Sequence, residues 1–325
     1  MNKATTTRSS SSKSTAKPTS GHTPVSNFTE TASEAEGPSK VLQQPSSEGK
    51  NPKTQRARED GTEDVPGFTL HALGLESPKL TAPDTSRLPD IAVASFGPAG
   101  PANVFPPDDR VQITNTAIYP WRVHAQLLIT ANDGSSWRGT GWFIGPHTLM
   151  TAGHVVFIRN SGVPNRDGWV RSIQVIPGRN GSSMPFGSVT STNFRSVTGW
   201  TLDGDQNQDY GAIILPTNLG NTTGWLGFGV YSDADLLSTV GNISGYPVDK
   251  PDGTQWYNAR RIASVDTRKV YYTIDTFGGQ SGSAVYRVIN GARYAFAIHA
   301  YGGATANSGT RIITPVFNNM VSWKD

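Results

Sequence analysis

Residues 277–285 read FGGQSGSAV, which places Ser281 among three glycines with little side-chain bulk around it. Gly and Ser are common in flexible loops, so an ordinary turn is one interpretation of this stretch. A serine nucleophile is the other, because a substrate carbonyl would need to approach the bare backbone beside it. The choice depends on whether the chain also supplies a base, an acid and a fold that holds them together.

The candidate base is His154, which closes the stretch TLMTAGH at residues 148–154. An apolar strand is followed there by small residues that let the backbone turn tightly, so the imidazole would sit at the end of a buried strand. Four other histidines lack such a setting. His22 and His71 lie in the polar N-terminal part, and His124 and His147 lie beside strand-like segments. His154 is therefore the predicted general base.

The candidate acid lies in LDGDQNQDYGAIILP, residues 202–216. Asp209 is favoured because it directly precedes an apolar strand, where a buried carboxylate could hold the Nδ1–H of a histidine in a low dielectric. Asp205 is the second candidate. The spacing of the acidic residues is similar to a calcium loop, but Gly is absent from the sixth position and Glu from the twelfth. No metal site is expected.

Glycines flank the candidate nucleophile where a reactive carbonyl would need room. The N–H groups of Gly279 and Ser281 could stabilise a developing oxyanion. A Cβ at position 279 would disfavour the required backbone conformation, and Gly282 would permit tight packing behind the serine. We therefore predict an oxyanion hole formed by Gly279 and Ser281.

The segments after residue 110 indicate an all-β domain. Short β-branched or aromatic runs alternate with turns such as NDG, PDG and NG, as in a sandwich or barrel. The expected strands are 121–130, 139–145, 147–152, 172–178, 210–216, 240–247, 255–265, 270–275, 282–288, 292–301 and 309–316. Short helices are expected after TAGH and within VFNNMVSW, residues 316–323. The order His154, Asp209, Ser281 is that of the chymotrypsin arrangement, unlike the subtilisin or α/β-hydrolase orders.

The chain divides into two parts of different composition. Up to about residue 90 it is dense in Ser, Thr, Pro, Lys and Glu, and its sparse apolar residues show no sustained period. Such a stretch buries too little apolar surface to offset its ordering entropy, so disorder or a pro-segment is expected. We place the boundary at 103, with a domain over 104–325.

Composition excludes several classes of function. The net charge is only +3 and no basic stripe is visible, so a nucleic-acid partner is not expected. No apolar run reaches the roughly 18 residues of a membrane span, and no signal-peptide h-region follows the N-terminus. The chain has no cysteine, which excludes disulfides and thiolate catalysis.

The motifs together resemble the glutamyl endopeptidase branch of the chymotrypsin-fold serine proteases. The similarity covers about residues 104–320 and rests on six stretches: VFPPDDRVQITNT (104–116), TLMTAGHVV (148–156), DYGAIIL (209–215), ISGYPVDKP (243–251), TFGGQSGSAV (276–285) and AIHAYGG (297–303). The resemblance implies two six-stranded antiparallel β-barrels with the active site between them.

The same resemblance implies a preference for Glu, or also Asp, at the P1 position of the substrate. Thr276 and His299 match the positions that hold the P1 carboxylate in that family, joined by the α-amino group of a mature chain that would begin at Val104. Residues 1–103 would then be a removable pro-segment. Since the bond after Asn103 is not a Glu bond, a separate processing protease is expected.

The function expected from these residues is a monomeric serine endopeptidase that acts on polypeptides through an acyl-enzyme and needs no cofactor. A serine peptidase with another P1 preference, a catalytically inactive protease-like binding module and a structural surface protein are the alternatives. The family favours an extracellular location. Because no signal peptide is visible, a cytoplasmic location is the alternative.

Overall fold

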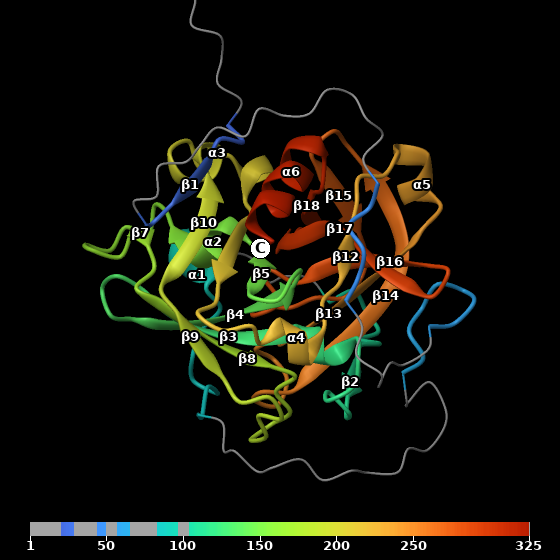
Figure 1. The fold of residues 1–325 in the computed structure, drawn as a ribbon, viewed down its shortest axis with the longest axis horizontal. Helices are drawn as coiled ribbons and strands as arrows, with labels where there is room; N and C mark the ends of the chain where they lie inside the picture. Colours follow the sequence, from blue (N-terminus) through green and yellow to red (C-terminus); the bar gives the residue numbers. More distant parts are fainter. Residues whose placement is uncertain (1–20, 29–43, 50–56, 66–82, 97–103, 325) are drawn as a thin grey trace, which may run out of the picture.

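The computed structural model describes residues 21–28, 44–49, 57–65, 83–96 and 104–324. Strands dominate the described part and form two large sheets, with short helices between them (Figure 1). The predicted all-β, chymotrypsin-like architecture with a short C-terminal helix is confirmed.

The first sheet contains eight strands joined by antiparallel pairs. Their order is β1 (Pro24–Ser26), β10 (Asn193–Val197), β11 (Gly211–Ile214), β5 (Thr148–Thr151), β4 (Ser136–Phe143), β3 (His124–Thr130), β8 (Ser172–Pro177) and β9 (Val189–Ser191). In β8, Ile173 and Val175 are buried while Ser172 and Gln174 are partly exposed, which is the period of two expected of a strand with one face in a core.

The second sheet closes into a six-stranded barrel. Its order is β17 (Ala292–Tyr301), β16 (Ala284–Ile289), β13 (Val240–Gly245), β14 (Gln255–Val265), β15 (Lys269–Tyr272) and β18 (Asn307–Arg311), and β18 pairs back with β17. Two shorter strands extend it, since β12 (Gly227–Phe228) joins β17 and β2 (Val111–Ile113) joins β14. A separate two-stranded ribbon pairs β6 (Phe157–Ile158) with β7 (Gly168–Trp169).

The helices are short and lie between the strands or against them. They are α1 (Ala92–Phe96), η1 (Trp121–Val123), α2 (Gly153–Val156), α3 (Thr198–Thr201), η2 (Gln206–Gln208), α4 (Gly220–Thr223), α5 (Asp233–Leu237) and α6 (Thr314–Trp323). The longest, α6, packs Val316, Phe317 and Met320 into the main hydrophobic core. Among the described helices, none is long and apolar enough to cross a membrane.

One hydrophobic core joins the two sheets. It includes Leu127 and Trp142 from the first sheet together with Ala284 and Ile298 from the second. A smaller core cluster containing Ile243 and Val270 fills the closed barrel. Because the two sheets share a core, loops from both can be held in fixed positions relative to one another.

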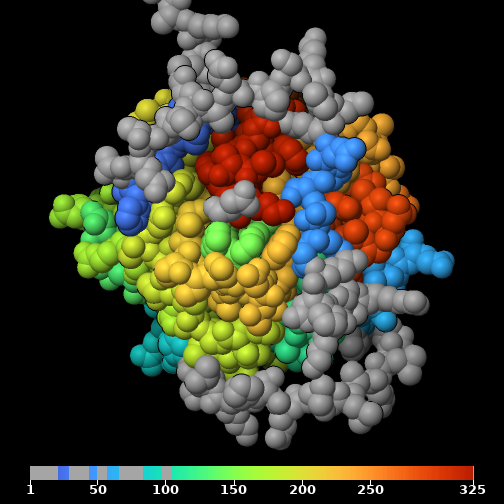
Figure 2. Space-filling view, in the orientation of Figure 1, coloured from blue at the N-terminus to red at the C-terminus, as the bar shows by residue number. Residues whose placement is uncertain are grey.

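The described stretches of the N-terminal part lie against this body. Strand β1 extends the first sheet beside β10, and residues 44–49 run along the surface near α6 (Figure 2). Val65 and Ile91 are fully buried. These stretches hold their places through edge pairing and single buried side chains, features that a sequence without a hydrophobic period does not reveal.

Candidate active site

His154 and Asp209 are brought together by strand register. β5 and β11 are antiparallel with Thr151 opposite Gly211, so the residues that follow β5 lie beside those that precede β11. Asp209 Oδ2 lies 2.8 Å from His154 Nδ1, and Asp209 Oδ1 accepts a hydrogen bond of 2.8 Å from the His154 backbone N–H. Two bonds to one carboxylate fix both the position and the ring orientation of the imidazole.

The environment of Asp209 keeps it ionised. Both Asp209 and His154 are fully buried. Burial by itself would raise the pKa of Asp209, but the neighbouring His154 and the hydrogen bonds from His154 and Tyr301 outweigh it and leave the pKa below its ordinary value. Asp209 can therefore carry the negative charge that an imidazolium would need beside it.

Tyr301 is a third partner in this group. Its hydroxyl donates a 2.5 Å hydrogen bond to Asp209 Oδ2, the same oxygen that faces His154 Nδ1. Burial and the Asp209 carboxylate raise the pKa of Tyr301, so it remains a neutral donor. The ammonium of Lys269 lies 4.3 Å from the centre of the Tyr301 ring. The sequence gives Tyr301 no role, because a tyrosine within AIHAYGG carries no local sign of a distant carboxylate.

The nucleophile candidate lies on a turn that leads from β15 into β16. Gly279 and Gly282 have φ angles of +93° and +91°, which L-residues with a Cβ rarely adopt. A Cβ at 279 would come 2.5 Å from the carbonyl oxygen of Tyr246, and one at 282 would come 2.1 Å from Thr151 Oγ1. The two glycines therefore hold Ser281 in a tight turn against the end of β5.

Contacts with the first sheet fix the other side of this turn. The Thr140 N–H donates a 3.0 Å hydrogen bond to the Ser281 carbonyl oxygen, so strand β4 of one sheet meets the nucleophile turn of the other. Ser281 is 5% exposed. His154 Nε2 is buried and has no hydrogen-bond partner among the described residues, so the bond from Ser281 to His154 is not formed in this structure.

The residues expected to recognise a P1 carboxylate lie on the same sheet as the turn. The Gly282 N–H donates to the His299 carbonyl at 2.8 Å, and the His299 N–H donates to the Ser283 carbonyl at 2.8 Å. His299 Nδ1 lies 2.8 Å from the Tyr272 hydroxyl. The hydroxyl of Thr276 is buried and, within the described ranges, has no hydrogen-bond partner.

The charge state of His299 follows from its burial. Burial, assisted by the nearby His154 and Lys269, lowers the pKa of His299 to about 3. The imidazole is therefore neutral here, and it can offer a ligand a hydrogen bond but not a positive charge.

Val104 lies beside the loop that carries Thr276. The N–H of its neighbour Phe105 donates a 2.7 Å hydrogen bond to Asp275 Oδ1, and Asp275 precedes Thr276 in the chain. Asp275 Oδ2 is buried and has no hydrogen-bond partner within the described part. Burial and the adjacent Asp109 carboxylate raise the pKa of Asp275, although Arg260 Nη2 lies 3.7 Å from Asp275 Oδ2.

Other predicted residues lie elsewhere. Asp205, the second candidate acid, caps η2 by accepting a 2.9 Å hydrogen bond from Asn207 N, and it pairs with Arg268 rather than with a histidine. His124 is fully buried without a hydrogen-bond partner among the described residues, and burial lowers its pKa to about 3. Neither residue shares the site of His154.

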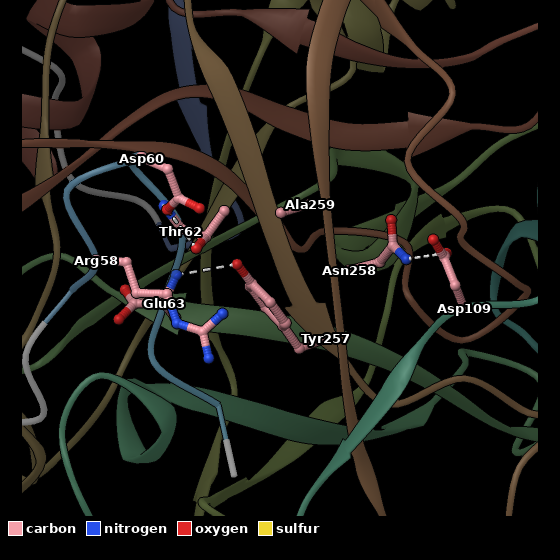
Figure 3. A pocket seen from close by; sticks show the side chains of 8 residues that line it. All are labelled: Arg58, Asp60, Thr62, Glu63, Asp109, Tyr257, Asn258 and Ala259. Carbon is pink, nitrogen blue, oxygen red and sulfur yellow. Dashed lines mark hydrogen bonds between the residues drawn. The ribbon is translucent and has the colours of Figure 1, made fainter. Parts of the chain in front are cut away.

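A pocket lies where residues 57–65 meet β14, and none of the predicted site residues lines it (Figure 3). There the Glu63 N–H donates a 3.1 Å hydrogen bond to the Tyr257 hydroxyl, and Asn258 Nδ2 donates to Asp109 Oδ1. Its lining residues are Arg58, Asp60, Thr62, Glu63, Asp109, Tyr257, Asn258 and Ala259. This pocket is a feature of how the N-terminal part docks, since Glu63 also forms a buried ion pair with Arg293.

Known proteins are similar to this chain in sequence and in fold. The chain is 43% identical over 226 residues to a glutamyl endopeptidase from Bacillus licheniformis, covering 67% of this chain and 68% of the relative. The chain belongs to the glutamyl endopeptidase family. A solved structure of a Glu endopeptidase in complex with MPD matches it with a TM-score of 0.59 and 30% identity, over 68% of this chain and 99% of that one. This glutamyl endopeptidase family member is a serine endopeptidase of chymotrypsin fold.

One similar protein carries a different name. An extracellular metalloprotease from Bacillus subtilis is 41% identical over 225 residues, covering 69% of this chain and 70% of that protein. Within the ranges that the structure describes, no group of three or more His, Cys, Asp or Glu side chains is placed to hold a metal ion. The donor set of a catalytic zinc site is thus not found in that part of this family member. No protein-family model matches the chain.

Proposed function

We propose that Ser281, His154 and Asp209 form the catalytic triad of this serine endopeptidase. Ser281 Oγ attacks the scissile carbonyl while His154 Nε2 takes its proton, and the imidazolium then passes that proton to the leaving amine. Water hydrolyses the acyl-enzyme by the reverse sequence. The observation that carries this proposal is the pair of 2.8 Å hydrogen bonds from His154 to Asp209, which leaves Nε2 as the free nitrogen.

The oxyanion of each tetrahedral intermediate is assigned to the N–H groups of Gly279 and Ser281. The positive φ of Gly279 supports this assignment, because it turns the peptide unit at the nucleophile in a way that a residue with a Cβ would resist. Donors that are fixed before the reaction stabilise developing charge without reorganising.

We further propose that the enzyme prefers Glu at P1. The names of the relatives support this preference, as does the buried, unpartnered hydroxyl of Thr276, which can donate to a carboxylate. If the Tyr272 hydroxyl donates to His299 Nδ1, then His299 Nε2 carries a proton and becomes a second, neutral donor. A buried carboxylate needs such donors to offset its lost hydration.

We propose that maturation produces an active chain that begins at Val104. A free α-amino group there would stand next to Asp275, whose second carboxylate oxygen is buried and without a hydrogen-bond partner in the described ranges. The new cation would join Arg260, which lies near both Asp275 and Asp109, and it would stand close to Thr276. We propose a secreted enzyme processed by a separate protease, in line with the extracellular location named for one relative.

Digestion of a peptide library by the processed enzyme, with Ser281→Ala as the control, tests these assignments. Cleavage mainly after Glu is expected, and no cleavage by the control. Indifference to Glu would remove the specificity proposal but keep the peptidase. Failure of a fluorophosphonate to label Ser281 would instead favour a catalytically inactive binding module.

A further inference from the structure

Residues 83–96 cross the mouth of the active site. The Arg138 N–H donates a 2.9 Å hydrogen bond to the Pro89 carbonyl, and the Ile91 N–H donates a 3.0 Å bond to the Arg138 carbonyl. Arg138 precedes Thr140 by two positions in β4, and the Thr140 N–H donates a hydrogen bond to the Ser281 carbonyl oxygen. The segment is therefore paired with the part of β4 that adjoins the nucleophile turn.

The side chain of Asp90 reaches the oxyanion site. The Gly279 N–H, assigned above to the oxyanion, is among the backbone donors that lower the pKa of its carboxyl group against the effect of burial. A Cβ built on Gly278 would come 3.2 Å from Asp90 Oδ2, so the carboxylate lies directly against the turn. Burial raises the pKa of Asp90 above its ordinary value, and the nearby His154 and Arg138 oppose that rise. A side-chain carboxyl group thus lies at the place of the transition-state oxyanion.

Phe96 covers the catalytic histidine. Its ring meets the His154 ring edge to face at 5.5 Å and the Tyr301 ring at 5.4 Å, and it lies 6.0 Å from Trp200. His154 is 0% exposed, and its Nε2 has no hydrogen-bond partner in the described part. With this ring in place, neither water nor a substrate amine can reach the imidazole.

The segment is anchored at several points along its length. Ile91 is 0% and Ala94 is 1% exposed, and both belong to the main hydrophobic core. The Ser95 hydroxyl accepts a 3.2 Å hydrogen bond from the Arg159 N–H, and at the other end the Thr85 N–H donates a 3.1 Å bond to Asp252. Buried anchors at both ends of the segment indicate that it is bound in the cleft along its length.

We propose that the active-site cleft is a docking surface for residues 83–96 and that this segment inhibits the enzyme from within its own chain, with the Asp90 carboxyl group in the oxyanion hole and Phe96 as the cover over His154. The inference rests on the proposed triad. The segment resists cleavage because the group at the oxyanion site is a side-chain carboxyl, which is a poorer electrophile than a peptide carbonyl.

Labelling of the intact full chain with a fluorophosphonate tests this inference, since the probe needs both Ser281 and the oxyanion site. Wild-type chain is expected to label slowly. Asp90→Ala and Phe96→Ala should label about 10- to 100-fold faster, the effect of removing a hydrogen bond to a charged group or an aromatic contact. Asp90→Asn keeps the shape without the charge and should also label faster, which guards against a folding defect.

Asp84→Ala is the matched control, because Asp84 lies in the same segment but contacts Ser86 rather than the cleft. It should label at the wild-type rate, and intact mass at each time point must show that no chain has been cut. Equal rates for wild type, Asp90→Ala and Phe96→Ala would overturn the proposal, as would a wild-type rate that depends on protein concentration.

The outcomes separate the two proposals. If processed wild-type enzyme labels quickly and every intact form labels just as quickly, only the inhibitory segment is refuted. If neither the processed enzyme nor any intact variant labels at Ser281, the triad itself is refuted, and the inhibitory role with it.

Discussion

Replacing Tyr301 by Phe should weaken catalysis without unfolding the enzyme. The substitution removes one hydroxyl, whose hydrogen bond to Asp209 Oδ2 is 2.5 Å long, and keeps the ring that packs beside His154. Tyr301 is thus predicted to act as a positioning residue, because it reaches the reaction only through Asp209.

The expected size follows from the kind of bond that is lost. A hydrogen bond to a charged group contributes about 1.5–3 kcal/mol, which corresponds to roughly 10- to 150-fold if all of it were expressed in the transition state. Because Asp209 keeps both of its bonds to His154, only part of this energy should reach the rate. We expect kcat/KM to fall by about 3- to 30-fold, mostly in kcat.

The pH profile should move as well. The Tyr301 hydroxyl helps to lower the pKa of Asp209, so its removal leaves more negative charge on the carboxylate that faces His154. That charge favours the protonated base, and activity should therefore be lost at a higher pH on the acid side. The shift should be a few tenths of a unit to one unit, since a stabilisation of about 1.4 kcal/mol corresponds to one unit.

Steady-state kinetics of the processed enzyme on a Glu-containing peptide, from pH 5 to 9, would measure both effects. Tyr271→Phe is the control, because it removes a similar tyrosine–aspartate bond, to Asp266, on the exposed side of β15. An unchanged kcat together with an unmoved acid limb in Tyr301→Phe would refute the reasoning. A loss of activity with an unmoved limb would indicate a packing role instead.

Four further outcomes are expected. Asp209→Asn should reduce kcat by about 10⁴-fold with the fold retained, measured by kinetics and circular dichroism. Thr276→Val should lower kcat/KM for Glu peptides by about 10-fold or more but change other peptides little, as a competition digest would show. Gly282→Ala, in a Ser281→Ala background, should destabilise the fold by about 2 kcal/mol or more in urea unfolding, because of the 2.1 Å contact with Thr151. His124→Leu in the same background should reduce the stability lost between pH 7 and pH 5 by about 2 kcal/mol, since the folded His124 stays neutral down to a pKa of about 3 while the unfolded one gains a proton near 6.5.

The strands that carry the site were predictable because each is a continuous apolar run next to a motif. TLMT before His154 and GAII after Asp209 became β5 and β11, and their pairing explains why a histidine and an aspartate 55 positions apart meet. The motif order alone could not give that pairing. It identified a fold class in which the two strands are neighbours.

Other elements left weaker traces in the sequence. β10, Asn193–Val197, contains only two strongly apolar residues and was not among the expected strands, because its stability comes from pairing with β11 and β1. The strand expected at 309–316 ends at Arg311 as β18, and Pro315 opens α6 instead, since proline suits the first turn of a helix.

The N-terminal part was the hardest to interpret. Its composition favours disorder, and in the described stretches its contacts come from isolated residues such as Val65, Asp90 and Phe96, each of which meets a partner far away in sequence. A period of two or 3.6 cannot reveal single contacts of this kind. The proposed placement of the Asp90 carboxyl group at the oxyanion site has no local signature at all.

The places of Phe96 and Val104 in the structure connect the proposed inhibition with the proposed activation. Phe96 ends the segment that covers His154, and Val104 begins the stretch whose backbone meets Asp275. A cut after residue 103 would free the inhibitory segment from its tether, which lowers its effective concentration at the cleft. The same cut would place an ammonium beside two carboxylates and close to Thr276. A cut before residue 83 would do neither, so the position of the cut, rather than the removal of the N-terminus as such, should determine when the enzyme becomes active.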